Sequence, residues 1–276
     1  MSTSIRAGAT LASLQIRPAL DAVDNRILLC HALGLSRVSL ITQSERTLTE
    51  DEAQRLSALV ARRAAGEPVA YIVGQREFFG LPFAVSDAVL IPRPDTELLV
   101  ELALARLPQG AAVLDMGTGS GAIAVALAHN RPDAAVSALD VSPAALDVAR
   151  RNAAANGARV EFLASDWYQA VQQRVFGMIV SNPPYIASGD RHLSEGDLRF
   201  EPAGALTDHA DGLSALRTIV AGAPAHLAPH AWLLMEHGYD QADAVRALLH
   251  AAGYADVQSW RDLAGIERVT GGRRPA

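Results

Sequence analysis

The four residues Asn182-Pro183-Pro184-Tyr185 carry the most distinctive chemistry of this sequence, directly after the apolar strand pattern 176–181. Prolines lack the backbone N–H and fix the chain, so two of them leave carbonyl oxygens to face a ligand. The Asn182 side chain adds an acceptor oxygen, and Tyr185 adds a flat ring. Two acceptors and a ring suit a planar –NH2 group, because the acceptors can take its two N–H bonds while the ring packs on its π-face.

Such an –NH2 group is a poor nucleophile, because its lone pair is delocalised. When both hydrogens are bound from one side, the nitrogen is drawn towards tetrahedral geometry and its lone pair is presented on the opposite side. No general base is needed before attack, since the nitrogen becomes acidic once it is substituted and then loses a proton to solvent. Taken alone, Asn-Pro-Pro also fits an ordinary turn at the end of a strand, so neighbouring motifs must decide.

A glycine-rich loop follows the strand pattern 111–116 and opens a helix; its residues are Gly117, Thr118, Gly119, Ser120 and Gly121. Glycine allows a sharp turn and a close approach of the backbone to a ligand, and the helix that follows offers free N–H groups. Together with Ala122 the loop also satisfies the dinucleotide fingerprint G-x-G-x-x-G/A. It therefore indicates an adenosine-containing cofactor without separating NAD from others, and a tight turn with close helix packing is the structural alternative.

Two further residues make this a candidate nucleoside site. Asp140 ends the next strand pattern, 19 residues after Gly121, where an acid can accept hydrogen bonds from ribose hydroxyls. On its own it would simply precede a helix N-terminus. Trp167 follows the third strand pattern, at the edge of the predicted sheet where an adenine would lie. Its indole can stack on the base or belong to the core, and the sequence leaves both open.

The elements that position these residues alternate between strand and helix from about residue 95. Strands are predicted over 111–116, 134–140, 159–164, 176–181 and 231–237, and helices over 120–130, 142–156, 213–227 and 240–251. This alternation predicts an α/β fold with a mostly parallel sheet covered on both faces. Ligands of such sheets bind beyond the carboxyl ends of the strands, where both candidate loops lie. Residues 254–260 and 266–270 are predicted to form a final hairpin at the sheet edge.

The first part of the chain has a different pattern. Apolar residues recur at helical spacing near residues 11–16, 27–33 and 56–60. Thr49 and Glu52 predict a capping box that opens a third helix. Residues 69–90 look strand-like, with a hairpin turn at Gly80-Leu81-Pro82.

Composition restricts the class of protein. The chain has 276 residues, a hydrophobic share of 50%, a net charge of −6 and one cysteine, Cys30. Residues 1–86 carry 9 Arg and 8 acidic residues, so the N-terminal part is near neutral and nothing marks it as a nucleic-acid arm. A single cysteine excludes an internal disulfide and fits a reducing compartment. We find no signal peptide, membrane span or metal-ligand spacing, and we expect a cytoplasmic monomer with no metal. All 24 basic residues are Arg, which together with abundant Ala suggests a bacterial source.

At these residues the sequence resembles the class I S-adenosylmethionine-dependent methyltransferases. More narrowly it resembles the HemK/PrmC family, which methylates the side-chain amide of glutamine in peptide-chain release factors. Besides both loops, the resemblance covers Ile91-Pro92-Arg93-Pro94-Asp95-Thr96-Glu97, Arg199-Phe200-Glu201-Pro202, Glu236-His237-Gly238 and Glu267-Arg268-Val269. It implies a Rossmann-like domain with a mostly parallel seven-stranded sheet, preceded by a small helical domain and a β-hairpin linker.

The resemblance also implies a role for each site residue. Gly117, Thr118, Gly119, Ser120 and Gly121 would hold the methionine part of S-adenosyl-L-methionine, Asp140 its ribose and Trp167 its adenine. Asn182 would lie between cofactor and substrate. The catalytic residues would be Asn182, Pro183 and Tyr185, and the glutamine of a Gly-Gly-Gln motif would bind to Asn182, Pro183, Pro184 and Tyr185.

The implied domains are a helical substrate-binding domain over 1–68, a β-hairpin linker over 69–92 and the methyltransferase domain over 93–276. Arg93 and Glu97 could close the cofactor pocket or pin the linker, and we favour the linker.

Three alternatives stay open. Asn-Pro-Pro-Tyr also occurs in adenine-N6 methyltransferases of nucleic acids, since that amine is conjugated in the same way. Such enzymes hold a nucleic-acid backbone and a flipped base, which the charge of this chain disfavours, so we expect no direct nucleic-acid partner. A glutamine methyltransferase of a ribosomal protein would look the same in sequence. A cofactor-binding module without activity is disfavoured because both loops are intact.

Overall fold

The computed structural model describes residues 5–16 and 18–276. The chain divides into two compact units, Met1–Gly74 and Gln75–Ala276. Each unit has its own buried apolar core, so each is described separately. Among the described residues, no helix is long and apolar enough to cross a lipid bilayer.

The N-terminal unit consists of short helices. They are α1 (Leu11–Ile16), α2 (Ala22–Leu33), α3 (Arg37–Thr42), α4 (Glu50–Ala64) and α5 (Val69–Val73). The predicted capping box is confirmed: the Thr49 hydroxyl accepts from the Glu52 N–H, and the Glu52 carboxylate accepts from the Thr49 N–H. This helix is the fourth rather than the third, because the sequence analysis did not anticipate α3.

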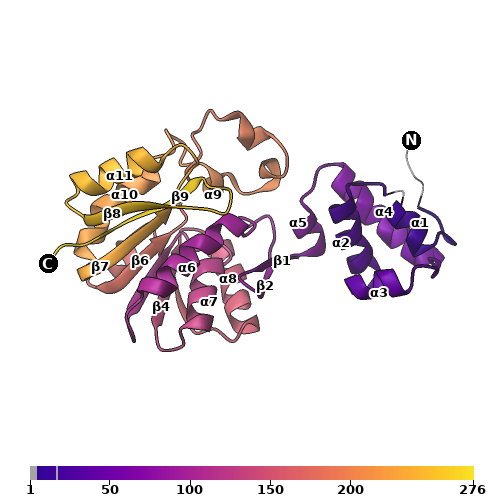
Figure 1. Ribbon diagram of the computed structural model, residues 1–276, viewed down its shortest axis with the longest axis horizontal. Coiled ribbons are helices and arrows are strands. Elements are labelled where there is room, and N and C mark those ends of the chain that lie inside the picture. Colours follow the sequence, from indigo (N-terminus) through magenta and orange to yellow (C-terminus); the bar gives the residue numbers. More distant parts are fainter. Residues whose placement is uncertain (1–4, 17) are drawn as a thin grey trace. The chain divides into compact units, whose positions relative to one another are not determined.

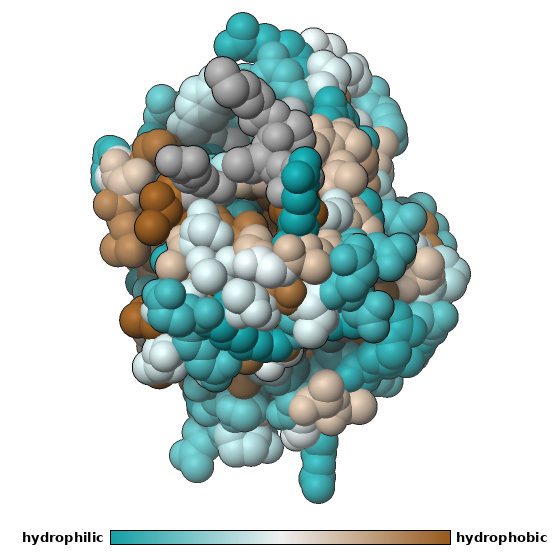
Figure 2. All heavy atoms as spheres, turned by 90° about the vertical axis from the view of Figure 1, so that its right-hand side faces the viewer, coloured by the Kyte–Doolittle hydropathy of each residue, from teal (hydrophilic) through white to brown (hydrophobic). Residues whose placement is uncertain are grey.

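Apolar side chains remain exposed on the N-terminal unit. Ile16, Val38 and Ile41 are 77%, 68% and 72% exposed. The side-chain amide of Gln15 donates to the Leu40 carbonyl at 3.3 Å, so α1 and α3 lie side by side there. Figure 2 shows one face of the chain, with brown, apolar atoms along one side of the view among teal and white ones. The unit therefore offers an apolar surface in addition to its buried core.

The predicted strand start at Val69 is wrong. Residues Val69–Val73 form helix α5, which begins after Pro68, ends at Gly74 in the left-handed conformation and buries Ile72 in the N-terminal core. The apolar, β-branched run favours a strand locally, but burial in a helical core decides its structure. The hairpin itself exists, as β1 (Gln75–Phe78) and β2 (Leu81–Ala84).

The C-terminal unit is built on the predicted sheet. Its strands are β3 (Ala112–Met116), β4 (Ala135–Asp140), β5 (Val160–Ala164), β6 (Phe176–Ser181), β7 (Leu227–Glu236), β8 (Ala255–Arg261) and β9 (Glu267–Arg273). Their order is β5-β4-β3-β6-β7-β9-β8, parallel through β7, with β9 antiparallel to both of its neighbours. The seven-stranded, mostly parallel sheet and its C-terminal edge hairpin are thus confirmed.

Helices cover both faces of this sheet (Figure 1). The longer ones are α6 (Glu97–Arg106), α7 (Ala122–Asn130), α8 (Pro143–Ala155), α10 (Ser214–Gly222) and α11 (Ala242–Ala251). Buried side chains of α6, α7 and α8 form one core with the sheet, and those of α10 and α11 form the other. Successive residues of β3 alternate between the two cores, as a strand buried on both faces requires. Shorter elements are η1 (Pro94–Thr96), η2 (Gln169–Val171), η3 (Arg191–Ser194), η4 (Leu198–Phe200), α9 (Ala203–Leu206) and η5 (Ala223–Ala225).

The strand order reverses between β3 and β6. From β3 the chain proceeds outward to β4 and β5, then returns to form β6 on the other side of β3. The loops after these four parallel strands consequently lie at one end of the sheet. An open α/β sheet binds ligands at such a switch point.

Candidate active site

A cavity of about 260 Å³ lies at this end of the sheet, and every residue that lines it belongs to the C-terminal unit. Its walls come from the loops that follow β3, β4, β5 and β6, together with two covering segments. The residues are Ala88, Val89, Leu90, Met116, Gly117, Gly119, Leu139, Asp140, Val141, Ser142, Ala145, Ser165, Asp166, Trp167, Asn182, Pro184, Pro202, Gly204 and Ala205. The structure therefore brings six of the predicted site residues to one cavity: Gly117, Gly119, Asp140, Trp167, Asn182 and Pro184.

The glycine loop needs its glycines for two different reasons. Gly117, Gly119 and Gly121 have φ values of +71°, +55° and +83°, which L side chains rarely adopt. At Gly121, a Cβ would also lie 3.0 Å from the Cβ of Ala149 in α8. Gly117 and Gly119 therefore turn the backbone towards the cavity. Gly121 allows helices α7 and α8 to lie close to each other.

The remaining loop residues lie behind the cavity wall. Thr118 and Ser120 are buried, and neither they nor Gly121 line the cavity. The Thr118 hydroxyl donates to Asp115 Oδ2 at 2.6 Å. Burial raises the pKa of Asp115 to about 7, although its hydrogen bonds from Thr118 and the Ala124 N–H act in the opposite direction. These contacts fix the shape of the loop from its inner side.

Asp140 links the glycine loop to the start of helix α8. Its Oδ2 accepts from the Gly119 N–H at 2.8 Å, and its Oδ1 accepts from the Ser142 N–H at 2.9 Å. Burial raises its pKa, and these two backbone hydrogen bonds lower it. A carboxylate oxygen can accept more than one hydrogen bond. Asp140 can therefore accept from a ligand hydroxyl while it holds the loop.

Trp167 lies both at the cavity and against the core. Its half-buried ring lines the cavity and also packs against the core beneath α10 and α11. The residue adopts a φ of +48°, and the Ser165 hydroxyl donates to its carbonyl at 2.7 Å. The turn thus holds the indole between the core and the cavity.

The Asn-Pro-Pro-Tyr loop presents some of its residues to the cavity and buries others. Asn182 and Pro184 line the cavity, whereas Pro183 is buried. The Asn182 side-chain amide donates to the Thr96 hydroxyl at 3.2 Å. Tyr185 does not line the cavity; its hydroxyl donates to Glu236 Oε1 at 3.3 Å. The structure therefore separates Asn182, at the cavity, from Tyr185, whose hydroxyl is held by the end of β7.

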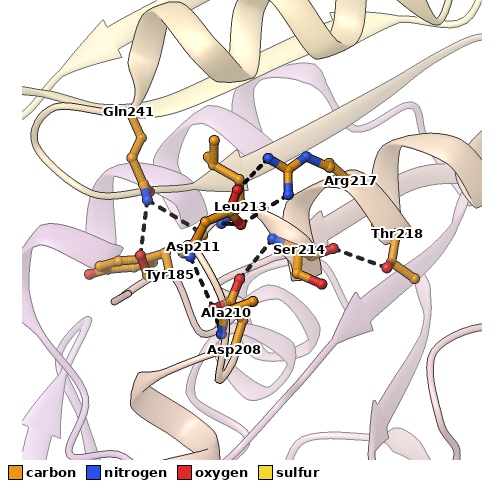
Figure 3. A network of polar contacts seen from close by, with 10 residues as sticks. Tyr185, Asp208, Ala210, Asp211, Leu213, Ser214, Arg217, Thr218 and Gln241 are labelled. Atoms are coloured by element: carbon orange, nitrogen blue, oxygen red, sulfur yellow. Dashed lines mark hydrogen bonds and ion pairs between the residues drawn. The ribbon is translucent and has the colours of Figure 1, made fainter. Parts of the chain in front are cut away.

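A second contact holds Tyr185 through its backbone (Figure 3). The Gln241 side-chain amide donates to the carbonyls of Tyr185 and Gly212, at 2.9 and 3.2 Å. Gly212 has a φ of +80°, and a Cβ there would lie 2.5 Å from the Tyr185 carbonyl oxygen. Asp208 shapes the same loop by accepting from the N–H groups of Gly212 and Ser214. The segment after α9 thus packs tightly against the Asn-Pro-Pro-Tyr loop.

Sequence reasoning assigned no role to Thr96, Glu236 or Gln241. Thr96 and Glu236 belong to two of the motifs that carry the family resemblance, so the sequence could have suggested a role for both residues. Gln241 had no signal in the sequence, because its contacts depend on the fold.

Arg93 and Glu97 have separate roles. Arg93 forms an ion pair with the buried Glu201 carboxylate, which also accepts from the Ile91 N–H at 2.9 Å. This joins the covering segments 88–90 and 202–205, so Arg93 closes the cavity wall. Glu97 accepts from the Phe79 N–H at 2.9 Å and therefore holds the hairpin.

Potential metal ligands do not cluster in the part of the chain that is described. Within residues 5–16 and 18–276, no group of three or more His, Cys, Asp or Glu side chains is arranged to hold a metal ion. The polar groups at the cavity are hydrogen-bonding groups: backbone, the carboxyl groups of Asp140 and Asp166, two serine hydroxyls and the Asn182 side-chain amide.

Known proteins match this chain over both units. The family model of the PrmC N-terminal domain matches residues 6–74, and that of the methyltransferase small domain matches residues 94–203. The release factor glutamine methyltransferase of Burkholderia pseudomallei is 59% identical over the whole of both chains. That of Neisseria gonorrhoeae is 52% identical over 92% of this chain and 94% of the relative. A solved methyltransferase structure from Pyrococcus furiosus, at 20% identity and a TM-score of 0.56, has the same fold over 80% of this chain and all of that one.

Proposed function

This chain belongs to the release factor glutamine methyltransferase family, and from that premise we propose how its residues carry out the reaction. The family methylates the side-chain amide nitrogen (N5) of a glutamine in peptide-chain release factors with S-adenosyl-L-methionine. The Rossmann-like, class I methyltransferase fold expected from the sequence is confirmed. The observation that carries the assignment of roles is the single cavity shared by the glycine loop, Asp140, Trp167 and Asn182.

The cavity fits S-adenosylmethionine by the chemistry of its lining. Gly117 and Gly119 expose backbone to the amino-acid part, and Asp140 accepts from the ribose hydroxyls. The indole of Trp167 offers a surface for adenine. Thr118, Ser120 and Gly121 support this binding from behind, because they shape the loop without lining the cavity. Asn182 completes the wall on the substrate side.

The substrate amide binds to the Asn-Pro-Pro-Tyr loop. Asn182 Oδ1 and the Pro183 carbonyl accept the two N–H bonds, while Pro184 and the Tyr185 ring bound the amide plane. This binding turns the nitrogen lone pair towards the cavity. S-adenosyl-L-methionine held in the cavity would supply a methyl group on a sulfonium sulfur, and in-line transfer to that nitrogen would leave the bonding pair on the sulfur. The methylated nitrogen then loses a proton to solvent, and alignment supplies most of the acceleration, roughly 7–11 kcal/mol in favourable cases.

We propose that the N-terminal unit binds the release factor. Its exposed apolar residues Ile16, Val38 and Ile41 offer a protein-binding surface. Helix α5 belongs to this unit, so we place the start of the hairpin linker at Gln75 rather than at residue 69. We further propose that the enzyme acts in the cytoplasm as a monomer, without a direct nucleic-acid partner.

Methyl transfer from labelled S-adenosylmethionine tests this assignment. The acceptors are a release factor, its Gln→Ala variant in Gly-Gly-Gln, a ribosomal-protein fraction and unmethylated DNA, and mass spectrometry locates the methyl group. We expect methylation of the release factor glutamine alone. Asn182→Ala should lower the rate by at least about 100-fold, since an acceptor aligned with the reacting group is lost.

The matched control is Asn130→Ala, because Asn130 is an exposed residue at the end of α7. It should be as active as the unaltered enzyme. Methyl groups on DNA or on a ribosomal protein would overturn the substrate assignment. An active Asn182→Ala enzyme would overturn the assignment of the catalytic loop.

A further inference from the structure

Thr96 occupies a helix N-cap position but does not cap its helix. It precedes α6, and its side chain makes no capping hydrogen bond. A threonine at this position normally accepts from an N–H of the first helical turn. Thr96 is instead 4% exposed, and its hydroxyl contacts two side chains, Asn182 and Glu236. The hydroxyl thus connects the catalytic loop to the end of β7.

The direction of these hydrogen bonds follows from how many protons each group has. The contact with Thr96 lowers the pKa of Glu236, as a donor to a carboxylate does, and because a carboxylate can only accept, this contact uses the single proton of the Thr96 hydroxyl. Its oxygen is then left as an acceptor, and the Asn182 Nδ2 group donates to it at 3.2 Å. Because the nitrogen of the amide is bound on this side, the Oδ1 of Asn182 faces away from Thr96. That oxygen is the one required to accept from the substrate –NH2 group.

Glu236 holds Tyr185 in the same way. Its side chain is 1% exposed at the end of β7, and Oε1 also accepts from the Tyr185 hydroxyl at 3.3 Å. Its Oε2 has no hydrogen-bond partner among the described residues. Leaving a buried acceptor unpaired costs free energy, so packing alone would favour an apolar residue there. One buried carboxylate thus orients both functional side chains of the loop.

We propose that Thr96 is a positioning residue that fixes the amide orientation of Asn182, and that Glu236 fixes the orientation of Thr96. This rests on the proposed role of Asn182 as the acceptor for the substrate amide. Neither Thr96 nor Glu236 lines the cavity, so both act through the loop. Without the Thr96 hydroxyl, either end of the Asn182 amide could face the substrate, and the reversed amide would present a donor to a donor.

The test compares Thr96→Val with Thr96→Ser. Valine keeps the volume and removes the hydroxyl, whereas serine keeps the hydroxyl. With saturating S-adenosylmethionine and a release factor, we expect Thr96→Val to lower the single-turnover methylation rate by about 10- to 100-fold. Thr96→Ser should stay within about threefold of the unaltered enzyme. The dissociation constant for S-adenosylmethionine should change by less than about threefold in both variants.

A double variant separates positioning from loss of packing. If Thr96 acts on Asn182, adding Thr96→Val to Asn182→Ala should lower the rate no further. Additive losses would overturn the proposal, as would a Thr96→Val enzyme that is as fast as Thr96→Ser. Should Thr96→Val fail to bind S-adenosylmethionine, Thr96→Ala applies the same test with a smaller side chain. A fully active Asn182→Ala enzyme would instead refute the proposed function, which keeps the two failures distinct.

Discussion

Two of the loops that line the cavity, the glycine loop and the Asn-Pro-Pro-Tyr loop, are held in place in different ways. The glycine loop is fixed by residues near it in sequence: Thr118 bonds to Asp115, 3 residues away, and Gly119 to Asp140, 21 residues away. The Asn-Pro-Pro-Tyr loop is fixed from a distance. Asn182 is held by Thr96, 86 residues away, and Tyr185 by Glu236 and Gln241, 51 and 56 residues away.

This difference matches the two tasks we assign to the loops. A cofactor-binding loop needs a backbone shape, which glycines and nearby side chains can provide by themselves. A loop that orients a reacting nitrogen needs side chains held in single orientations, and neighbours on other elements must provide this. Variants of the first loop should therefore alter cofactor affinity, and variants of the supports around the second should alter the rate.

Gly212→Ala should have the largest effect. The new Cβ would lie 2.5 Å from the Tyr185 carbonyl oxygen, at a φ of +80° that alanine rarely adopts. Because the Tyr185 backbone must move, we expect the methylation rate to fall by about 100-fold. S-adenosylmethionine affinity, measured by calorimetry, should change by less than about threefold.

Gly189→Ala is the matched control for this variant. Gly189 follows the same catalytic loop, has no positive φ, and a Cβ there would meet nothing within 4 Å. It should keep the full rate. An active Gly212→Ala enzyme would show that Tyr185 need not be held in place.

Asp140→Asn should act on affinity instead. The variant loses charge-assisted hydrogen bonds to the ribose, which contribute about 1.5–3 kcal/mol each. We expect S-adenosylmethionine to bind about 10- to 100-fold more weakly, while the rate at saturation stays within about threefold. Asp147→Asn serves as the control, since Asp147 is exposed and forms an ion pair with Arg150 on α8. Unchanged affinity in Asp140→Asn would remove Asp140 from the cofactor site.

The smallest expected effect concerns pH. Burial raises the pKa of Glu236 to about 7; Asp95 also raises it, while Arg268 and the hydroxyls of Thr96 and Tyr185 lower it. Below this pH the carboxyl group is protonated and can itself donate, so the Thr96 hydroxyl no longer has to donate to it. The Thr96 oxygen is then no longer kept as an acceptor for Asn182, and the Asn182 amide loses its fixed orientation. The single-turnover rate should therefore fall a few-fold from pH 8 to pH 6, with loss on the acid side.

Glu236→Gln removes the titrating group, so its rate should be lower at pH 8 but nearly independent of pH. The test is to measure the single-turnover rates of both enzymes at saturating S-adenosylmethionine between pH 6 and pH 8. An unchanged pH profile in Glu236→Gln would assign the titration to another group.

Local sequence patterns predicted much of this structure because much of it is local. The strand over 176–181 and the capping box of Thr49 and Glu52 depend on adjacent residues, and both are confirmed. Residues 69–73 were mispredicted because the N-terminal core, not the local pattern, makes them helical. Helix α6 was missed, since its apolar residues do not follow one clear face. The motifs of Thr96 and Glu236 were visible in the sequence, but their contacts with Asn182 and Tyr185 could not be predicted, because only the sheet order brings the start of α6 and the ends of β6 and β7 together.

One pair of measurements tests the division between the loops most directly: S-adenosylmethionine affinity and single-turnover methylation of a release factor, both made on Asp140→Asn and on Thr96→Val. We predict that Asp140→Asn loses affinity and keeps its rate at saturation, and that Thr96→Val keeps its affinity and loses rate. Equal losses of both quantities in both variants would contradict this account, because the two loops would then act as one unit.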